Sequence, residues 1–378
     1  MIREILSANG KSECLLSNVC ILYIFCFILI LLRRHNFPSA FLLIYRFHDV
    51  PRIYEDEVNY NLPLLFTQQL KNYSLNSPIN NKSKHHTLFL FLTSSGYHLH
   101  YTANAYCSLK VYLQPNYYIF IALDKKSFIE MNNLNIPTIL YSDTLPKVDI
   151  TVLRLIIANQ LLMWDVDVIQ SDSDLVYFDN PLQLFEDEDD WEVSYENPQK
   201  ISKFRKSPGY TINCGFWKLK SSTINKIFMK RWILSCFKYK MPDQESLTAY
   251  LKTQNGSWID KNRFRFYFSD DKIYYTIQFI DTLKVTLANS IFCEKHRLLF
   301  KRSAKARNIS MPVVYHLAWF WKTRKPSALA DKNAWFINFP HNKKCKNPPP
   351  NGTKMFWDKK FDIQHEIPLK FNMSHFPP

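Results

Sequence analysis

Three short apolar segments, separated by stretches with helical periodicity, constrain the fold of this chain more than any other feature. They are "TLFLFL" at 87–92, "YYIFIAL" at 117–123 and "DVIQS" at 167–171. Uninterrupted runs of this kind are typical of strands that are buried on both faces. The stretch between the first two, "YTANAYCSLKVY" at 101–112, is compatible with a helix. Strand, crossover helix and strand in succession predict parallel pairing, and therefore an α/β fold.

The segment before the third strand, "DITVLRLIIANQLLMW" at 149–164, is apolar on nearly every side when it is drawn as a helix. One helical face carries five large apolar side chains, those of Leu153, Ile156, Ile157, Leu161 and Trp164. We therefore expect this helix to be buried. Together the patterns predict a Rossmann-like central sheet, mixed but mostly parallel, that is flanked by helices.

Composition excludes some classes of function. Glycine supplies only 6 of the 378 residues, and the chain contains neither GxGxxG nor GxxxxGK[ST], so a Gly-rich phosphate loop is excluded. The net charge of +15 would suit phosphate groups, an anionic membrane surface or nucleic acid. Because the basic residues are scattered and no nucleic-acid-binding motif occurs, we expect no nucleic-acid partner.

An uncharged apolar segment at 14–32 is long enough to span a bilayer. A cleaved signal peptide is the competing interpretation. Its apolar run would be unusually long, and the "RRHN" that follows is a poor cleavage site. We expect a single, uncleaved N-terminal transmembrane helix that acts as a signal anchor.

The orientation of this span is predicted from glycosylation sequons, because basic residues flank it on both sides and do not decide the matter. All the N-x-[ST] sequons follow the span. They begin at Asn72, Asn81, Asn255, Asn308, Asn351 and Asn372. We therefore expect a single-pass type II protein of the Golgi or ER membrane, with its folded domain in the lumen.

The expected organisation has five parts. They are a cytoplasmic tail at 1–13, the anchor at 14–32, a polar stem at 33–84, a folded domain at 85–345 and a C-terminal extension at 346–378. Five cysteines follow the span, at Cys107, Cys214, Cys236, Cys293 and Cys345. An oxidising lumen would permit up to two disulfides among them, with the pairing left open.

Asp-x-Asp occurs twice around the third strand. Asp165 and Asp167 lie at the start of the strand, whereas Asp172 and Asp174 lie just past its C-terminal end. Open α/β sheets bind ligands at the carboxyl ends of their strands, so position favours the second copy. Two such carboxylates point to the same side of an extended segment and could share Mn²⁺ or Mg²⁺. A solvated turn is the alternative, and we expect the acidic run at 186–190 to be a solvated loop.

The second copy lies in "SDSDLVYFDNPLQLF" at 171–185, which resembles the Asp-x-Asp segment of the nucleotide-diphospho-sugar transferases, a family of GT-A fold glycosyltransferases. Further matches follow in family order over 87–330, including "INCGFWKLKSS" at 212–222, "PDQESLTAYL" at 242–251 and "VVYHLAWFWKTRKPSAL" at 313–329. The resemblance implies a GT-A fold and a hexosyl- or pentosyltransferase. Such an enzyme moves a sugar from a nucleotide-diphosphate donor to a glycan or protein hydroxyl. We expect the donor to be UDP-linked, and the resemblance favours retention of configuration.

The same resemblance implies roles for individual residues. Asp172, Asp174 and His316 would ligate Mn²⁺ or Mg²⁺, and Asp243 and Gln244 would face the transferred sugar as catalytic residues. The residues expected to bind the substrate are Asn104, Asp172, Asn213, Gly215, Lys322 and Lys325. Simpler roles stay open, since His316 could be packed in the core, Asp243 could cap a helix and Gly215 could permit a tight bend. We expect His98 and His100 only to border the nucleotide loop.

The sequence also departs from the family pattern. Asp165 stands near the position before the strand where the family often has Gly, Cys214 replaces the usual Ser, and Thr248 stands where related helices often carry Asn. These departures leave the choice of acceptor open. The competing hypothesis is a catalytically inactive, membrane-anchored protein of the same fold that binds nucleotide sugars or carbohydrates.

Overall fold

The computed structural model describes residues 61–142, 148–196, 212–268, 272–288, 294–318 and Cys345. The predicted span at 14–32 lies outside these residues, as do Lys322 and Lys325. Among the described residues, no helix has the length and apolar character needed to cross a membrane.

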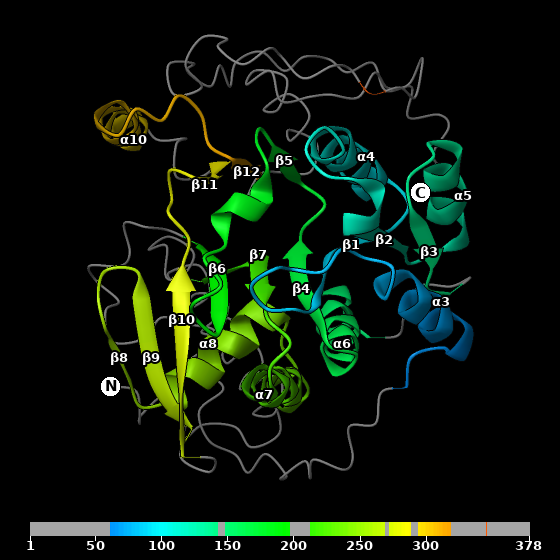
Figure 1. Ribbon diagram of the computed structural model, residues 1–378, viewed down its shortest axis with the longest axis horizontal. Coiled ribbons are helices and arrows are strands. Elements are labelled where there is room, and N and C mark those ends of the chain that lie inside the picture. Colours follow the sequence, from blue (N-terminus) through cyan, green and yellow to red (C-terminus); the bar gives the residue numbers. More distant parts are fainter. Residues whose placement is uncertain are drawn as a thin grey trace, which may run out of the picture. The chain divides into compact units, whose positions relative to one another are not determined.

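A large mixed sheet organises the fold (Figure 1). Its strands are β1 His86–Thr93, β2 Tyr118–Ala122, β3 Thr138–Leu140, β4 Val166–Ser171, β6 Trp191–Tyr195, β7 Ile212–Leu219, β8 Gly256–Trp258, β9 Arg263–Phe268 and β10 Ile273–Phe279. They are hydrogen-bonded in the order β3-β2-β1-β4-β7-β6-β10-β9-β8. Within this sheet β7 and β9 run opposite to the other strands, so the predicted mixed, mostly parallel α/β sheet is confirmed.

The strands predicted from the three apolar segments are β1, β2 and β4. Helix α4, Tyr97–Leu109, follows β1 and begins before the expected start, so it also contains His98 and His100. Because β2 and β4 pair with opposite edges of β1, the chain changes direction across the sheet at this strand. In an open α/β sheet this arrangement creates a crevice at the carboxyl ends of the two diverging strands, here β1 and β4.

The two faces of the sheet bury different kinds of side chain. On β1, Leu88 and Leu90 enter one core, while Phe89 and Phe91 enter the other. The helices that contribute to the first core are α3 Leu64–Ser74, α6 Ile150–Met163, α7 Thr223–Tyr239 and α8 Asp243–Thr253. The second core contains side chains of α4, of α5 Lys125–Asn133, and of a three-stranded sheet. That sheet has the order β11 Val285–Leu287, β12 Val314–His316 and β5 Leu175–Tyr177.

Helix α6 is buried, as its sequence predicts. Leu153, Ile157 and Leu161 are fully buried in the first core, and Trp164 packs against it from the C-cap position. The carboxylate of Asp149 caps the other end by accepting a hydrogen bond from the Thr151 N–H at 2.8 Å.

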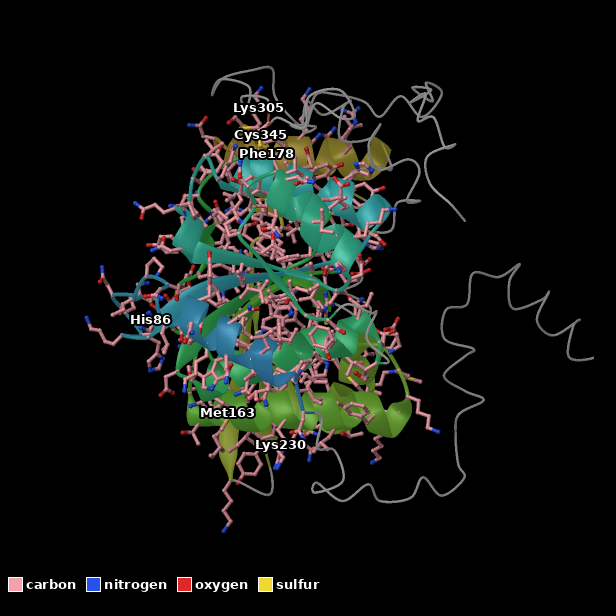
Figure 2. The ribbon with its side chains drawn as sticks, turned by 90° about the vertical axis from the view of Figure 1, so that its right-hand side faces the viewer. His86, Met163, Phe178, Lys230, Lys305 and Cys345 are labelled. Carbon is pink, nitrogen blue, oxygen red and sulfur yellow. A yellow bond between two sulfur atoms is a disulfide. The ribbon has the colours of Figure 1, made fainter. Side chains whose placement is uncertain are left out.

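Two further features join distant parts of the chain. Helix α3 falls within the segment assigned to the stem, yet its Phe66 and Leu70 are buried in the first core. Cys107 on α4 forms a disulfide with Cys345, which packs near Phe178 (Figure 2). This bond joins Cys345, far beyond β12 in the sequence, to α4.

The first Asp-x-Asp copy stabilises the fold. The buried carboxylate of Asp167 accepts hydrogen bonds from the Ser221 N–H at 2.7 Å and the Ser83 hydroxyl at 2.6 Å, and it lies 3.3 Å from His85 Nδ1. Asp165 is exposed and pairs with Lys226 at 2.8 Å. Asp167 therefore ties the segment before β1 and the end of β7 to the start of β4.

The expectation of a solvated loop at 186–190 is wrong for part of the run. Asp187 forms an ion pair with the buried Lys218. Asp190 accepts a hydrogen bond from the Thr276 N–H at 2.8 Å. These acids are partly buried because backbone and lysine donors converge on them, which the acidic composition does not reveal.

We predict that Asp167→Asn lowers the free energy of unfolding by about 2–3 kcal/mol, because it removes the charge from a buried acceptor of several hydrogen bonds. Urea unfolding followed by circular dichroism measures this loss. Asp165→Asn, the matched exposed control, should cost less than about 1 kcal/mol. Equal losses for the two variants would contradict a structural role for Asp167 alone.

Candidate functional site

The second Asp-x-Asp copy lies in the crevice at the end of β4. Asp172 follows β4 directly, and Asp174 precedes β5. The antiparallel pairing of β5 with β12 puts His316 opposite Leu175, and the Leu317 N–H donates to the Asp174 carbonyl at 3.2 Å. Strand register therefore brings a histidine from far along the chain to the two aspartates.

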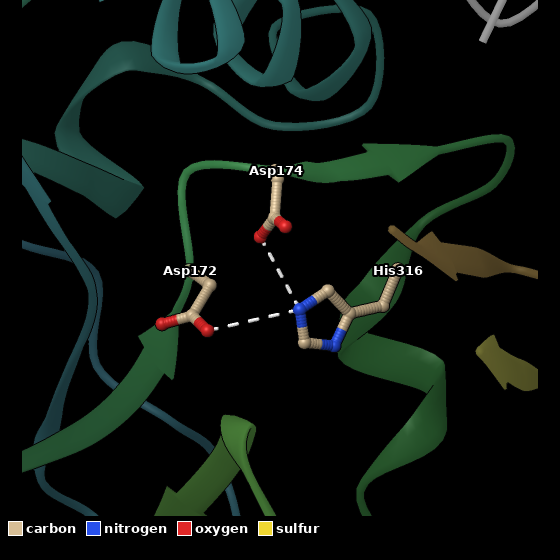
Figure 3. A group of neighbouring side chains, drawn as sticks. All are labelled: Asp172, Asp174 and His316. Atoms are coloured by element: carbon tan, nitrogen blue, oxygen red, sulfur yellow. Dashed lines mark ion pairs between the residues drawn. The ribbon is translucent and has the colours of Figure 1, made fainter. Parts of the chain in front are cut away.

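These three side chains point toward one another (Figure 3). The Nε2 atom of His316 lies 3.2 Å from Asp174 Oδ1 and 3.7 Å from Asp172 Oδ2. One potential ligand atom from each residue lies within 4.8 Å of the others. Asp172 is the most exposed of the three, with 33% of its side chain accessible, so the cluster opens on its side.

The donor set and the space around it fit a divalent cation. Two carboxylate oxygens and one imidazole nitrogen suit Mn²⁺ and, less well, Mg²⁺.

Gly215 on β7 forms the floor of the cluster, and its carbonyl accepts the Asp172 N–H at 2.7 Å. A Cβ at Gly215 would lie 2.6 Å from Asp172 Oδ2 and would also collide with His316. The position therefore needs glycine because the neighbouring side chains approach the backbone so closely.

Asn213 is part of the same floor. Its Oδ1 accepts the Gly215 N–H at 2.9 Å, and its Nδ2 donates to Glu196 Oε2 at 2.6 Å. Asn213 and Glu196 are both buried. The Glu196 carboxylate thereby fixes the orientation of the Asn213 amide beside the cluster.

Arg154 is a site residue that we did not predict. This buried arginine of α6 pairs with Asp172 through Nη1. It also pairs with Asp243 through Nη2, and its Nε donates to Asp243 Oδ2 at 2.8 Å. One guanidinium therefore joins the Asp-x-Asp segment to the start of α8. The sequence did contain an indication of this role, namely a single arginine in a largely apolar helix. A buried arginine requires ion-pair or hydrogen-bond partners.

The expected catalytic pair lies on the far side of Arg154. Asp243 is buried in the first turn of α8, and the Oε1 atom of Gln244 accepts the Cys214 N–H at 3.1 Å. Burial raises the pKa of Asp243 to about 6, although Arg154 opposes this rise. Asp243 and Asp172 are therefore linked by the Arg154 guanidinium, which pairs with both carboxylates.

Of the other residues expected to bind or border the substrate, some lie on α4 and some lie outside the described residues. Asn104 is buried on α4. His98 and His100 lie in the first turns of α4 and are outside the Asp172, Asp174 and His316 cluster. Lys322 and Lys325 lie outside the described residues.

Comparison with known proteins adds a family match. The sequence profile of the nucleotide-diphospho-sugar transferases matches residues 116–319. This range contains the whole Asp172, Asp174 and His316 cluster together with Arg154 and Asp243. A comparison with curated proteins finds no match.

Several solved structures are similar to the chain. They include the glycosyltransferase GlyE of Streptococcus pneumoniae TIGR4 (14% identity, 62% of this chain, 55% of that chain, TM-score 0.39) and the bifunctional glycosyltransferase WbbM (11%, 65%, 48%, 0.42). A third is the galactosyltransferase LgtC in complex with donor and acceptor sugar analogues (14%, 61%, 86%, 0.39). The chain spans about half the length of the first two.

We predict that Arg154→Met lowers the free energy of unfolding by about 3–5 kcal/mol, because it leaves the buried carboxylate of Asp243 without its counter-charge. Adding Asp243→Asn should recover at least about 1 kcal/mol in a double-mutant cycle measured by urea unfolding. Arg263→Met removes an exposed ion pair with Asp260 and is the control, with an expected loss below about 1 kcal/mol. Strict additivity of the first two substitutions would refute the coupling.

The raised pKa of Asp243 predicts a pH dependence of stability. In the folded state the Asp243 carboxyl keeps its proton up to about pH 6, whereas in the unfolded state it loses the proton near its ordinary pKa of 3.8. The stabilisation is therefore complete below about pH 4 and is lost as the pH rises through about 6, by roughly 2–3 kcal/mol. Urea unfolding at several pH values should show this loss in the wild type relative to Asp243→Asn. Parallel stability curves would exclude the shift.

Proposed function

We propose, because the chain belongs to the nucleotide-diphospho-sugar transferase family, that it transfers a sugar from a nucleotide-diphosphate donor to an acceptor hydroxyl. In this reaction the bond from the anomeric carbon to the diphosphate oxygen breaks, and a bond to the acceptor oxygen forms as the hydroxyl loses its proton. The observation that carries the proposal is the convergence of Asp172, Asp174 and His316 at the end of β4.

We assign the cation to this cluster. Asp174 and His316 face each other inside it, and Asp172 stands at its open side, next to the crevice where a donor would enter. A bound Mn²⁺ or Mg²⁺ would neutralise the negative charge that develops on the departing diphosphate. His316, which is 2% exposed, would supply a nitrogen ligand, and this favours Mn²⁺ over Mg²⁺.

The neighbouring residues have positioning roles in this proposal. Arg154 holds Asp172 and Asp243 in one arrangement, and its positive charge favours the ionised form of both carboxylates. Asp243 and Gln244 would face the transferred sugar from the start of α8. Asn213 and Gly215 would lie beneath the donor, since both border the cluster from β7. Lys322 and Lys325 remain our proposed contacts to the diphosphate.

We further propose a UDP-linked donor, a glycan or glycoprotein acceptor and retention of configuration at the anomeric carbon. The chain would be anchored by the segment at 14–32, with its folded domain in the lumen of the Golgi or ER. Two observations support this location. The four sequon asparagines among the described residues are all exposed, at Asn72, Asn81, Asn255 and Asn308. The Cys107–Cys345 disulfide also suits an oxidising compartment.

We predict that Asp174→Ala reduces transfer from the donor by at least about 100-fold, because it removes a metal ligand from the cluster. UDP release should be measured with a panel of UDP-sugars, with and without Mn²⁺. Chelation of the metal should produce a loss of similar size in the wild type. Asp165→Ala, from the first Asp-x-Asp copy, is the matched control and should retain activity within about threefold.

The same assay separates the enzyme from an inactive binding protein of the same fold. Release of UDP that requires Mn²⁺ and Asp174 supports transfer. Tight UDP binding without turnover of any donor would favour the inactive protein. An active Asp174→Ala variant would refute the role assigned to Asp174.

A further inference from the structure

A second hollow lies outside the metal cluster. It is a cavity of about 190 Å³ between the start of β6, the C-terminal end of β10 and the turn that precedes β11. Its lining includes none of the residues assigned above to the cation or the donor. At about 30 Å³ per water, the space corresponds to about six water molecules, which is comparable to one pyranose ring.

Hydrogen-bonding groups with unused capacity line this cavity. Glu192 and Gln278 are neighbours in the parallel pairing of β6 with β10. Glu192 is 2% exposed, and its Oε1 accepts the N–H groups of Glu186 and Asp187 at 2.5 and 3.3 Å, while its Oε2 accepts no hydrogen bond from the described residues. The Oε1 atom of Gln278 is buried and has no hydrogen-bond partner within the described part of the chain. A buried acceptor in this state is destabilising unless a ligand or a water donates to it.

The remaining walls combine apolar surface with nearly balanced charge. Leu184 and Ile280 contribute apolar atoms. Arg307 at the rim is already paired with Asp281, and Lys284 lies in the same lining as Glu186 and Glu192. Burial raises the pKa of Glu192 to about 7, so near neutrality this carboxyl can donate as well as accept. The lining therefore favours neither an anion nor a cation.

The cavity is connected to the strands that carry the metal cluster. The Lys284 carbonyl accepts the N–H groups of Val313 and Val314, both at 2.9 Å, just before His316 on β12. Leu184 ends the short 3₁₀ helix Pro181–Leu184 that follows β5, and β5 begins next to Asp174. Residues that line the cavity are therefore hydrogen-bonded to, or close in sequence to, the strands that carry the cluster.

We propose that this cavity binds one uncharged sugar unit, through hydroxyl contacts to Glu192 and Gln278 and through the apolar wall formed by Leu184 and Ile280. A sugar hydroxyl both donates and accepts, which matches a carboxyl beside an amide, and the ring carbons match the apolar wall. This inference rests on the proposed function, because it makes the cavity a subsite for the acceptor glycan. The cavity would hold a sugar residue of the acceptor other than the one that receives the transferred unit.

The test measures binding without nucleotide and without metal, so it is independent of turnover. Methyl glycosides of galactose, mannose and glucose are titrated against the full chain in detergent, with saturation-transfer difference NMR as the readout. We expect saturable binding of at least one glycoside with a Kd of roughly millimolar order. Gln278→Met, which keeps the side-chain size, should weaken this binding by about tenfold.

Three controls make the outcome decisive. Lys284→Ala should change the affinity by less than about threefold, and glucuronic acid should bind no better than the uncharged glycosides. Asp174→Ala should bind the glycosides like the wild type even where transfer is lost, which separates failure of this subsite from failure of the proposed function. An unfolding temperature of Gln278→Met equal to or above that of the wild type confirms that the variant is folded, since the substitution removes a buried, unpaired acceptor. Absence of saturable binding, equal binding by Gln278→Met, or a preference for glucuronic acid would overturn the proposal.

Discussion

The candidate site depends on one buried arginine side chain, that of Arg154. Arg154 belongs to the largely apolar helix α6, and its guanidinium extends to ion-pair partners in two other parts of the chain. These partners are Asp172 after β4 and Asp243 at the start of α8. Removing such a charge from water is costly, so its hydrogen-bonded partners are needed to keep it buried. The same pairing prevents Asp172 and Asp243 from repelling each other. Arg154 thereby couples the interior of the first core to the crevice where a nucleotide sugar would bind.

The two Asp-x-Asp copies show how position along a strand decides the role of a carboxylate. Asp167, at the start of β4, is surrounded by protein donors that hold distant segments together. Asp172 and Asp174, beyond the other end of β4, face His316 and open towards the crevice. At the start of a parallel strand the neighbouring loops supply structural contacts, whereas at its carboxyl end the diverging chain leaves room for a ligand. Chemically equivalent motifs a few residues apart therefore acquire different functions.

Much of the architecture was predictable because it is encoded in local periodicity. The apolar runs identify β1, β2 and β4, and the nearly continuous apolar surface at 149–164 identifies α6 as a buried helix. The start of α4 was predicted too late, since "YHLH" has no apolar periodicity that distinguishes it from a loop. The partly buried acids at 186–190 were missed, because their donors, such as Lys218 and the Thr276 N–H, come from other strands.

The sequence alone determined the α/β class, the strand that ends in the second Asp-x-Asp, and the residue types able to hold a divalent cation. Periodicity and composition suffice for these features because they involve neighbours along the chain. The meeting of His316 with the two aspartates was implied by the family resemblance and not by any local pattern, and the strand register of the structure produces it. Only the tertiary structure decided that Arg154 joins Asp172 to Asp243 and that Cys107 pairs with Cys345. Each of these contacts depends on strand order and register, through which segments far apart in sequence become neighbours, and local patterns carry no information about that choice.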